Sequence, residues 1–263
     1  MAIHFADIHC HLLPGIDDGA RDWDESLAMA RLAVADGTTI IVATPHQLGS
    51  FGHNTGEQIR QRVAELQARL NAAGIALAVL PGADVRIEDG MVERLVAGEV
   101  LTLGDHRRHV LLELPHELYL PLEPLLDRLA RHNMVGILSH PERNLGIIRQ
   151  PDVLGPLVDA GCLLQITAGS LSGSFGPVCR ETAEWLLNEG LVHLVATDAH
   201  GSHTRRPLMQ CAYERVAERT DQQTADDLCW HHPAAVAAGG DVPGGRRQAP
   251  HRRRAWWRRK SAA

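Results

Sequence analysis

Short apolar runs rich in β-branched residues recur along the chain. Most of them are almost continuously apolar, a pattern typical of parallel strands that are buried on both faces. This pattern predicts seven strands, at residues 4–8, 38–44, 76–81, 109–114, 135–139, 163–167 and 192–197.

Between these runs the apolar residues are spaced three or four positions apart, which indicates amphipathic helices. In residues 55–73, for example, Ile59, Val63 and Leu66 fall on one helical face. We predict helices at residues 24–36, 55–73, 121–133, 152–160, 178–189 and 205–218. Four glycines stand where helices should end, as capping glycines do: Gly37, Gly74, Gly161 and Gly190.

Seven strands that alternate with helices predict an α/β fold, either a β/α barrel or a doubly wound sheet. The 263 residues suffice for one such domain and are few for two. We assign residues 1–220 to this domain and residues 221–240 to a candidate terminal helix. The Pro-, Gly- and Arg-rich residues 241–263 are expected to form a basic, disordered tail.

The cysteines and the N-terminal residues favour a cytoplasmic protein. The five cysteines are an odd number and form no CxxC pair, so we expect reduced thiols rather than a disulfide framework. The first residues lack the basic start and apolar stretch of a signal peptide. No apolar run approaches the roughly 20 residues that cross a bilayer.

The charge is unevenly distributed. Residues 246–260 contain eight of the 26 lysines and arginines and no acidic residue, which leaves 18 basic against 32 acidic residues elsewhere. An acidic body of this kind disfavours a nucleic-acid partner. The basic tail with its two tryptophans has the composition to contact an anionic membrane surface or an acidic partner, although a solvated tail without a partner is the simpler expectation.

The first strand ends in a pair of histidines that suits a metal ion. Residues two apart in an extended segment point to the same side, so His9 and His11 can bind one ion together. Cys10 lies between them and should face the opposite side, where it would pack rather than bind. An HxH pair alone is weak evidence for a metal site, since two surface histidines give the same pattern.

Histidines and carboxylates recur at the other strand ends. Six of the seven predicted strands finish in this way, and the further residues are His46, Asp84, Glu113, His140, Asp198 and His200. In a β/α barrel the C-terminal strand ends converge on one face, where active sites lie. In an open sheet they would be spread along an edge, so the pattern favours the barrel.

Together with Asp17 or Asp18, these residues make more ligands than one ion needs. One ion takes three or four protein ligands, so two or three ions are expected. Nitrogen and oxygen ligands without thiolate suit manganese, iron or zinc better than magnesium or calcium. Glu113, between two leucines, would be costly to bury unpaired, and either a metal ion or a salt bridge to an arginine would offset that cost.

Several segments resemble the PHP (polymerase and histidinol phosphatase) superfamily. They are DIHCHLLPGIDDGA, ATPH, PGADVRI, LLELP, SHPERN and ATDAHG, and they cover roughly residues 5–215. Within the superfamily they are most similar to the bacterial manganese-dependent protein tyrosine phosphatases of capsule and exopolysaccharide loci. The resemblance implies a distorted seven-stranded β/α barrel with three divalent ions.

The resemblance also implies a distribution of ligands, residue by residue. The first ion would be bound by His9, His11, Asp84 and Asp198, the second by Asp84, Glu113 and His140, and the third by Asp18, His46 and His200. Asp17 is a rival for Asp18. The chain departs from the family at Asp84, where the family usually has glutamate, and this puts the affinity or spacing of the metals in doubt. Arg86 matches a family arginine and supports the alignment.

The resemblance predicts hydrolysis of a phosphate ester by a metal-bound hydroxide. Arg143 and Arg205 match the family's phosphate-contacting arginines, with Arg206 as a neighbouring alternative to Arg205, although both could be ordinary surface arginines. No cysteine has an arginine six residues later, and no GxSxG motif is present, so a cysteine- or serine-based mechanism is disfavoured.

The expected substrate is phosphotyrosine in the tail of a bacterial tyrosine autokinase that controls polysaccharide export, a partner implied by the resemblance. A second hypothesis keeps the chemistry and changes the substrate to a small phosphomonoester, such as histidinol phosphate or a sugar phosphate. A third is a catalytically weak metal-binding module, for which Asp84 is the main argument.

Overall fold

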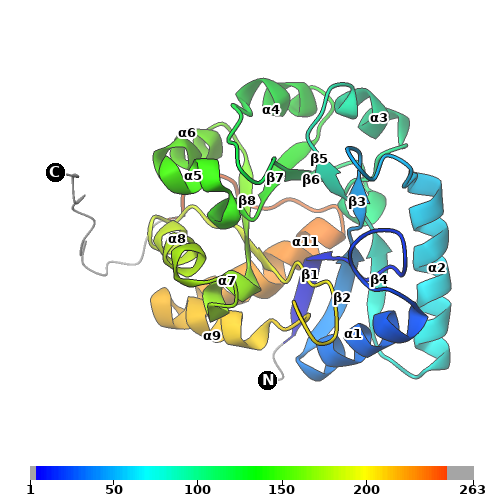
Figure 1. Ribbon diagram of the computed structural model, residues 1–263. Helices are drawn as coiled ribbons and strands as arrows, with labels where there is room; N and C mark the ends of the chain where they lie inside the picture. Colours follow the sequence, from blue (N-terminus) through cyan, green and yellow to red (C-terminus); the bar gives the residue numbers. More distant parts are fainter. Residues whose placement is uncertain (1–3, 248–263) are drawn as a thin grey trace.

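The computed structural model describes residues 4–247, in which parallel strands alternate with helices (Figure 1). The strands are β1 (Phe5–Cys10), β2 (Thr38–Ala43), β3 (His46–Gln47), β4 (Ala78–Pro81), β5 (Asp84–Arg86), β6 (His109–Glu113), β7 (Val135–Ser139), β8 (Leu163–Thr167) and β9 (Leu194–Ala196). Each of the seven predicted strands coincides with one of these, within two residues at either end. The α/β class is therefore confirmed.

The strands form two parallel sheets. One has the order β1-β2-β4 and the other β3-β5-β6-β7-β8-β9. The chain passes from the first sheet to the second twice, at Thr44–Pro45 and at Gly82–Ala83. A Cβ atom on Gly82 would lie 2.6 Å from Cγ1 of Val42, so glycine allows the close approach there. A single parallel bridge, Cys10 to Ala199, joins the end of β1 to the segment after β9.

Helices surround the strands, most of them on the outer faces and the C-terminal ones at one end. They are α1 (Trp23–Ala35), α2 (Gly56–Ala72), α3 (Met91–Ala97), α4 (Glu123–Ala130), α5 (Leu145–Arg149), α6 (Leu154–Asp159), α7 (Ala168–Ser172), α8 (Pro177–Asn188), α9 (Gln210–Arg219), α10 (Gln222–Asp226) and α11 (His232–Ala237). Three 3₁₀ turns, η1 (Leu103–Asp105), η2 (Pro141–Arg143) and η3 (Pro151–Val153), and a π-helical turn, η4 (Asp227–His231), complete the described elements.

The helix boundaries follow from local chemistry. Thr55 and Gln58 form a capping box at the start of α2. The four predicted capping glycines all follow helices with φ between 66° and 106°, the left-handed region that glycine enters without strain. One prediction was too long, because α9 begins at Gln210 and residues 205–209 form a loop.

The buried residues form two clusters on opposite faces of the strands. The larger one, the outer core, fills the space between strands and helices, and in β6 it includes Val110 and Leu112. The smaller one, the inner cluster, takes the alternate positions, such as Leu111, as expected for side chains with a period of two. Its members are Ile8, Val42, Leu103, Leu111, Ile137, Leu163, Leu194, Ala196, Val236 and Ala237.

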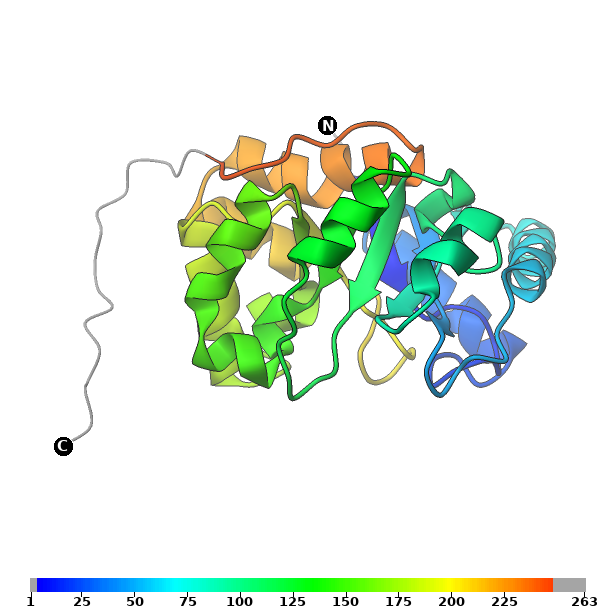
Figure 2. The ribbon, with the colours of Figure 1, turned by 90° about the horizontal axis from the view of Figure 1, so that it is seen from above.

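The C-terminal helices cover one end of the strands. Val236 and Ala237 of α11 belong to the inner cluster, and α11 and η4 pack against β1 and β9. The His4 ring, directly before β1, lies 6.0 Å from the Trp230 ring of η4. Figure 2 shows these helices in orange along one edge and the loops near residues 15 and 200 at the opposite edge. The C-terminal strand ends are therefore left free to carry a site.

Residues 241–247 differ from the expected disordered tail, because they are held by contacts to the domain. The N–H of Arg247 donates to the carbonyl of Gly190 at 2.8 Å, and Arg246 pairs with Asp159 at 3.2 Å. The remaining part of the predicted tail, with its tryptophans and its proposed membrane contact, lies outside the described residues. Among the described helices none is long and apolar enough to cross a membrane.

The same segment generates a prediction about pH. The buried ring of His193 accepts a hydrogen bond from the N–H of Leu164 and donates one to the carbonyl of Gly245, and burial lowers its pKa from 6.5 to about 4. Below pH 6.5 the unfolded chain binds a proton that the folded chain does not, so stability falls as the pH drops towards 4. We expect this histidine to contribute about 3 kcal/mol to that loss.

Urea unfolding of the metal-stripped protein between pH 7.5 and 4.5 measures this effect. His193→Gln should be less stable than the wild type at pH 7.5 but should lose less stability as the pH falls. Equal slopes for the two proteins would contradict the assignment.

Candidate metal centre

The end of β1 and the segment after β9 bring together four of the expected ligands, which are His9, His11, Asp198 and His200. The N–H of Asp198 donates to the carbonyl of His9 at 2.7 Å, and the N–H of His11 donates to the carbonyl of Ala199 at 2.9 Å. His9 and His11 face the same side, with their Nε2 atoms 3.3 Å apart, and Cys10 points into the outer core. This confirms the orientations that the HxH spacing predicts.

All nine expected ligands gather in four overlapping groups, in each of which the ligand atoms lie within 4.8 Å of one another. The groups are His11, Asp18, His46 and His200; His9, His11 and Asp84; His9, His140 and Asp198; and His46, Asp84 and Glu113. They differ from the distribution that the resemblance implies, because His140 lies with His9 and Asp198 rather than with Asp84 and Glu113.

Asp84 has the surroundings of a metal ligand. It begins β5, beside His46 in the register of β3, and its side chain is fully buried. Neither carboxylate oxygen has a hydrogen-bond partner among the described residues, and the nearest ring nitrogens, of His9 and His46, are 3.5 and 3.4 Å away. A buried carboxylate without partners is unfavourable unless a cation neutralises it. The residues present therefore fit a divalent ion.

The electrostatics of two neighbours agree with this. Burial, and then the adjacent carboxylate of Asp84, raise the pKa of Glu113 to about 7, because a low-dielectric environment and a like charge both disfavour the ionised form. Burial and then the charge of Arg143 lower the pKa of His140 to about 3. His140 is therefore neutral at pH 7, which is the form that binds a metal.

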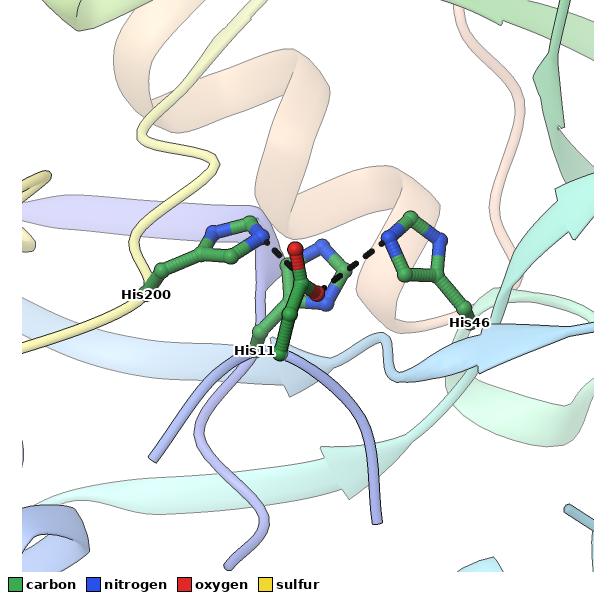
Figure 3. Close-up of side chains that lie close together, drawn as sticks. His11, His46 and His200 are labelled. Atoms are coloured by element: carbon green, nitrogen blue, oxygen red, sulfur yellow. Dashed lines mark ion pairs between the residues drawn. The ribbon is translucent and has the colours of Figure 1, made fainter. Parts of the chain in front are cut away.

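The pair Asp17 and Asp18 takes two different positions. Asp17 is buried and accepts hydrogen bonds from Nδ1 of His11 at 2.7 Å and from the N–H of His46 at 3.1 Å. Asp18 is 57% exposed, and its carboxylate lies 3.5 Å from Nε2 of His46 and 3.3 Å from Nε2 of His200. Figure 3 shows the rings of His11, His46 and His200 converging from three segments. The carboxylate of Asp18 thus faces the rings of His46 and His200, whereas that of Asp17 orients the ring of His11.

The sequence did not single out two buried polar residues that support the site. Oε1 of Gln165, in β8, accepts a hydrogen bond from Nδ1 of His9 at 2.9 Å, which leaves Nε2 of that ring facing Asp84 and Asp198. Glu142 accepts hydrogen bonds from the N–H of Thr167 and the hydroxyl of Ser170. Two features of the sequence could have pointed to them. Gln165 is a polar residue inside the apolar run LLQIT, and Glu142 is a glutamate of SHPERN to which no role was assigned.

Three residues of the site have a backbone conformation that is rare for side chains of their kind. His140, Asp198 and Arg205 have φ values of 33°, 51° and 48°. Such strain persists where the surroundings fix it and is frequent at functional sites. Each of the three follows a strand end or lies in the loop after β9, at the mouth of the site.

Two arginines reach the same carboxylate. Arg143 and Arg205 both donate to Oδ2 of Asp198, whereas Oδ1 faces the histidine cluster. Arg206, the alternative to Arg205 in the sequence, is exposed on the same loop. Both Arg143 and Arg205 line a cavity of 180 Å³ together with His140, Glu113 and other residues of the centre.

A cluster of histidines and carboxylates at the C-terminal ends of parallel strands defines a metal-binding α/β protein. Residues 5–238 match the capsular polysaccharide synthesis family CpsB/CapC, and the chain belongs to this family. The match continues past residue 215, where the sequence motifs fade.

Named relatives support the assignment. The chain is 39% identical to the tyrosine-protein phosphatase YwqE of Bacillus subtilis over 201 residues, which are 76% of this chain and 78% of that protein. It is 34% identical to the putative tyrosine-protein phosphatase CapC of Staphylococcus aureus over 204 residues, 77% of this chain and 79% of the relative.

A solved structure also matches. It comes from the crystal structures of YwqE from Bacillus subtilis and CpsB from Streptococcus pneumoniae, metal-dependent tyrosine phosphatases. The TM-score is 0.88 at 33% sequence identity, covering 94% of this chain and all of the other.

The geometry of the aspartate pair gives a testable prediction. Asp18→Asn removes a candidate ligand and should lower the number of ions bound per chain. Asp17→Asn leaves that number unchanged and should weaken binding about 10–100-fold, because His11 loses the anion that orients it. Calorimetric titration of the metal-stripped protein with manganese measures both quantities.

Asp127→Asn, an exposed change on α4, is the matched control. If Asp17→Asn lowered the number of ions and Asp18→Asn did not, the two roles would have to be exchanged.

Proposed function

We propose that this chain is a metal-dependent phosphatase that hydrolyses phosphotyrosine in proteins. The observation that carries the proposal is Asp198, which faces the histidine cluster with one oxygen and two arginines with the other. A phosphate group bound by the arginines would lie directly beside the metal centre. The names of the relatives favour a tyrosine phosphate over other esters.

The proposed cofactor is a cluster of three divalent ions, with manganese as the first choice and iron or zinc as alternatives. Four overlapping ligand groups are more than one ion can use, which supports a cluster. The ligands are histidines and carboxylates without thiolate, a set that suits these metals. Among the carboxylates of the described residues, Asp84 alone belongs to two of the groups, so it would be available to two ions despite being shorter than glutamate.

The proposed mechanism assigns separate tasks to the residues of the site. Bound divalent ions lower the pKa of water and neutralise charge on phosphate oxygens. Arg143 and Arg205 bind the phosphoryl oxygens, for which the planar guanidinium is well suited. Nε of Arg205 is buried without a hydrogen-bond partner among the described residues and offers a further donor. The phenol of tyrosine, with a pKa of about 10, can leave without a dedicated acid.

We also propose that the two sheets act as one distorted seven-stranded barrel. In this interpretation β2 and β3 are halves of one strand, as are β4 and β5. The bridge from Cys10 to Ala199 would close the ring between β1 and β9, and the inner cluster drawn from both sheets would fill it. Such a closed arrangement explains why ligands from both sheets meet at one face.

The proposed substrate protein is the phosphorylated tyrosine-rich tail of an autokinase of polysaccharide export. The family description and the names of the relatives support a role in capsule or exopolysaccharide synthesis. One residue that lines the cavity, Asp18, is 57% exposed, so the cavity opens at the surface. This favours an exposed protein segment as the substrate. The proposed location is the cytoplasm, where the five free cysteines would stay reduced.

Hydrolysis of a phosphotyrosine peptide tests the proposal. Metal-stripped protein is assayed with manganese, zinc, magnesium or no addition, beside histidinol phosphate as a small substrate. We expect manganese-dependent cleavage of the peptide, and a loss of at least about 100-fold in His140→Ala, because that change removes a metal ligand. His132→Ala, an exposed histidine after α4, is the matched control and should keep full activity.

Cleavage of histidinol phosphate alone would retain the chemistry and reject the protein substrate. Absence of turnover with every metal would reject the enzyme in favour of a metal-binding module.

A further inference from the structure

The ring of Phe175 lies against both arginines of the site. Phe175 stands in the loop between α7 and α8, and its ring centroid is 4.2 Å from Cζ of Arg143 and 5.8 Å from Cζ of Arg205. At these distances a guanidinium is attracted to an aromatic face by cation–π interaction. Each guanidinium therefore has an anionic partner in Asp198 and an aromatic partner in Phe175.

The space for this ring is provided by a glycine. A Cβ atom on Gly169 would lie 2.7 Å from Cε2 of Phe175, closer than real contacts allow. Gly169 is part of α7 and does not have a positive φ, so its backbone conformation is one that alanine adopts readily. The ring of Phe175, rather than the helix, explains the absence of a side chain at this position.

The loop that carries Phe175 is also fixed relative to Arg143. Glu142, the residue before Arg143, is fully buried, and its Oε1 accepts hydrogen bonds of 2.8 Å from the N–H of Thr167 and 2.7 Å from Oγ of Ser170. Thr167 and Ser170 belong to the junction of β8 and α7. Glu142 therefore links the backbone beside Arg143 to α7, and the N–H of Ser174, next to Phe175, donates to the carbonyl of Gly169 in α7 at 2.8 Å.

We propose that Phe175 is a positioning residue that orients Arg143 and Arg205 for phosphate. Arginine side chains are long and lose much conformational freedom when they bind a ligand. The aromatic face restricts both guanidiniums before the substrate arrives, so less freedom is lost on binding. The inference rests on the proposed function of the two arginines.

Phe175→Leu tests the inference, because leucine keeps an apolar contact and removes the aromatic face. We expect kcat/KM for a phosphotyrosine peptide to fall roughly three- to thirtyfold, and the inhibition constant of inorganic phosphate to rise by a similar factor. Manganese content and the circular dichroism spectrum should be unchanged. Phe175→Trp keeps an aromatic face and should stay close to the wild type.

Trp23 supplies a matched control of the same chemistry. Its ring contacts Arg69 at 4.3 Å and Arg62 at 5.8 Å, on a part of the surface formed by α1 and α2. Trp23→Leu removes two cation–π contacts of similar geometry and should leave kcat/KM and phosphate inhibition unchanged.

Gly169→Ala tests the same idea without changing Phe175. It should displace the ring and reproduce part of the loss, but it should have little further effect in the Phe175→Leu background, since the ring is then absent. Such non-additivity is the signature of residues that act on one another. Phosphate affinity is also measured by calorimetry with the manganese-loaded protein, so the inference is tested even if no peptide is cleaved.

Failure of the wild type to cleave any ester would count against the proposed function and leave the phosphate measurement to decide this inference. Unchanged phosphate affinity in Phe175→Leu would overturn it. If Phe175→Leu does not fold, unchanged phosphate affinity in Gly169→Ala, the change that displaces the ring, would overturn it instead.

Discussion

A buried carboxylate with no hydrogen-bond partner among residues 4–247 is the constraint around which this protein is organised. Asp84 lies where the chain passes from one sheet to the other, and within the described part of the chain its nearest neighbours are ring nitrogens of His9 and His46, 3.5 and 3.4 Å away. Such a group is unfavourable by several kcal/mol unless a cation accompanies it. Burial, and then the carboxylate of Asp84, raise the pKa of Glu113 to about 7, so this part of the site disfavours a further negative charge. Divalent ions bound at this position would offset both effects, and the metal centre would then contribute to the stability of the folded structure.

The carboxylates of the site gather at the C-terminal ends of the strands, and helices cover the N-terminal ends. The helices after residue 220 cover the N-terminal ends of the strands and complete the inner core with Val236 and Ala237. The loops after the strands are thereby free to carry polar residues, and backbone hydrogen bonds between the ends of β1 and β9 fix His9 and Asp198 beside each other. A second layer of buried polar groups, Asp17 and Gln165 among them, orients the histidines. Substitutions in that layer should therefore change metal affinity more than overall stability.

The sequence predicted the strands and the convergence of the ligands because both leave local signals. A buried parallel strand is continuously apolar, and a histidine or carboxylate at its end interrupts that pattern visibly. The strands β3 and β5 were missed because two or three residues after Pro45 or Gly82 show no period. Phe175 and Glu142 were missed because their roles arise only when segments distant in sequence meet. The choice between Asp17 and Asp18 likewise depends on a turn whose geometry the sequence does not specify.

The most direct test of the account is anomalous X-ray diffraction from crystals of the protein grown with manganese. The account predicts three manganese peaks at the C-terminal ends of the strands, at least one of them in contact with the carboxylate of Asp84. A manganese-loaded crystal in which no peak contacts Asp84 would contradict the claim that this buried carboxylate is neutralised by metal.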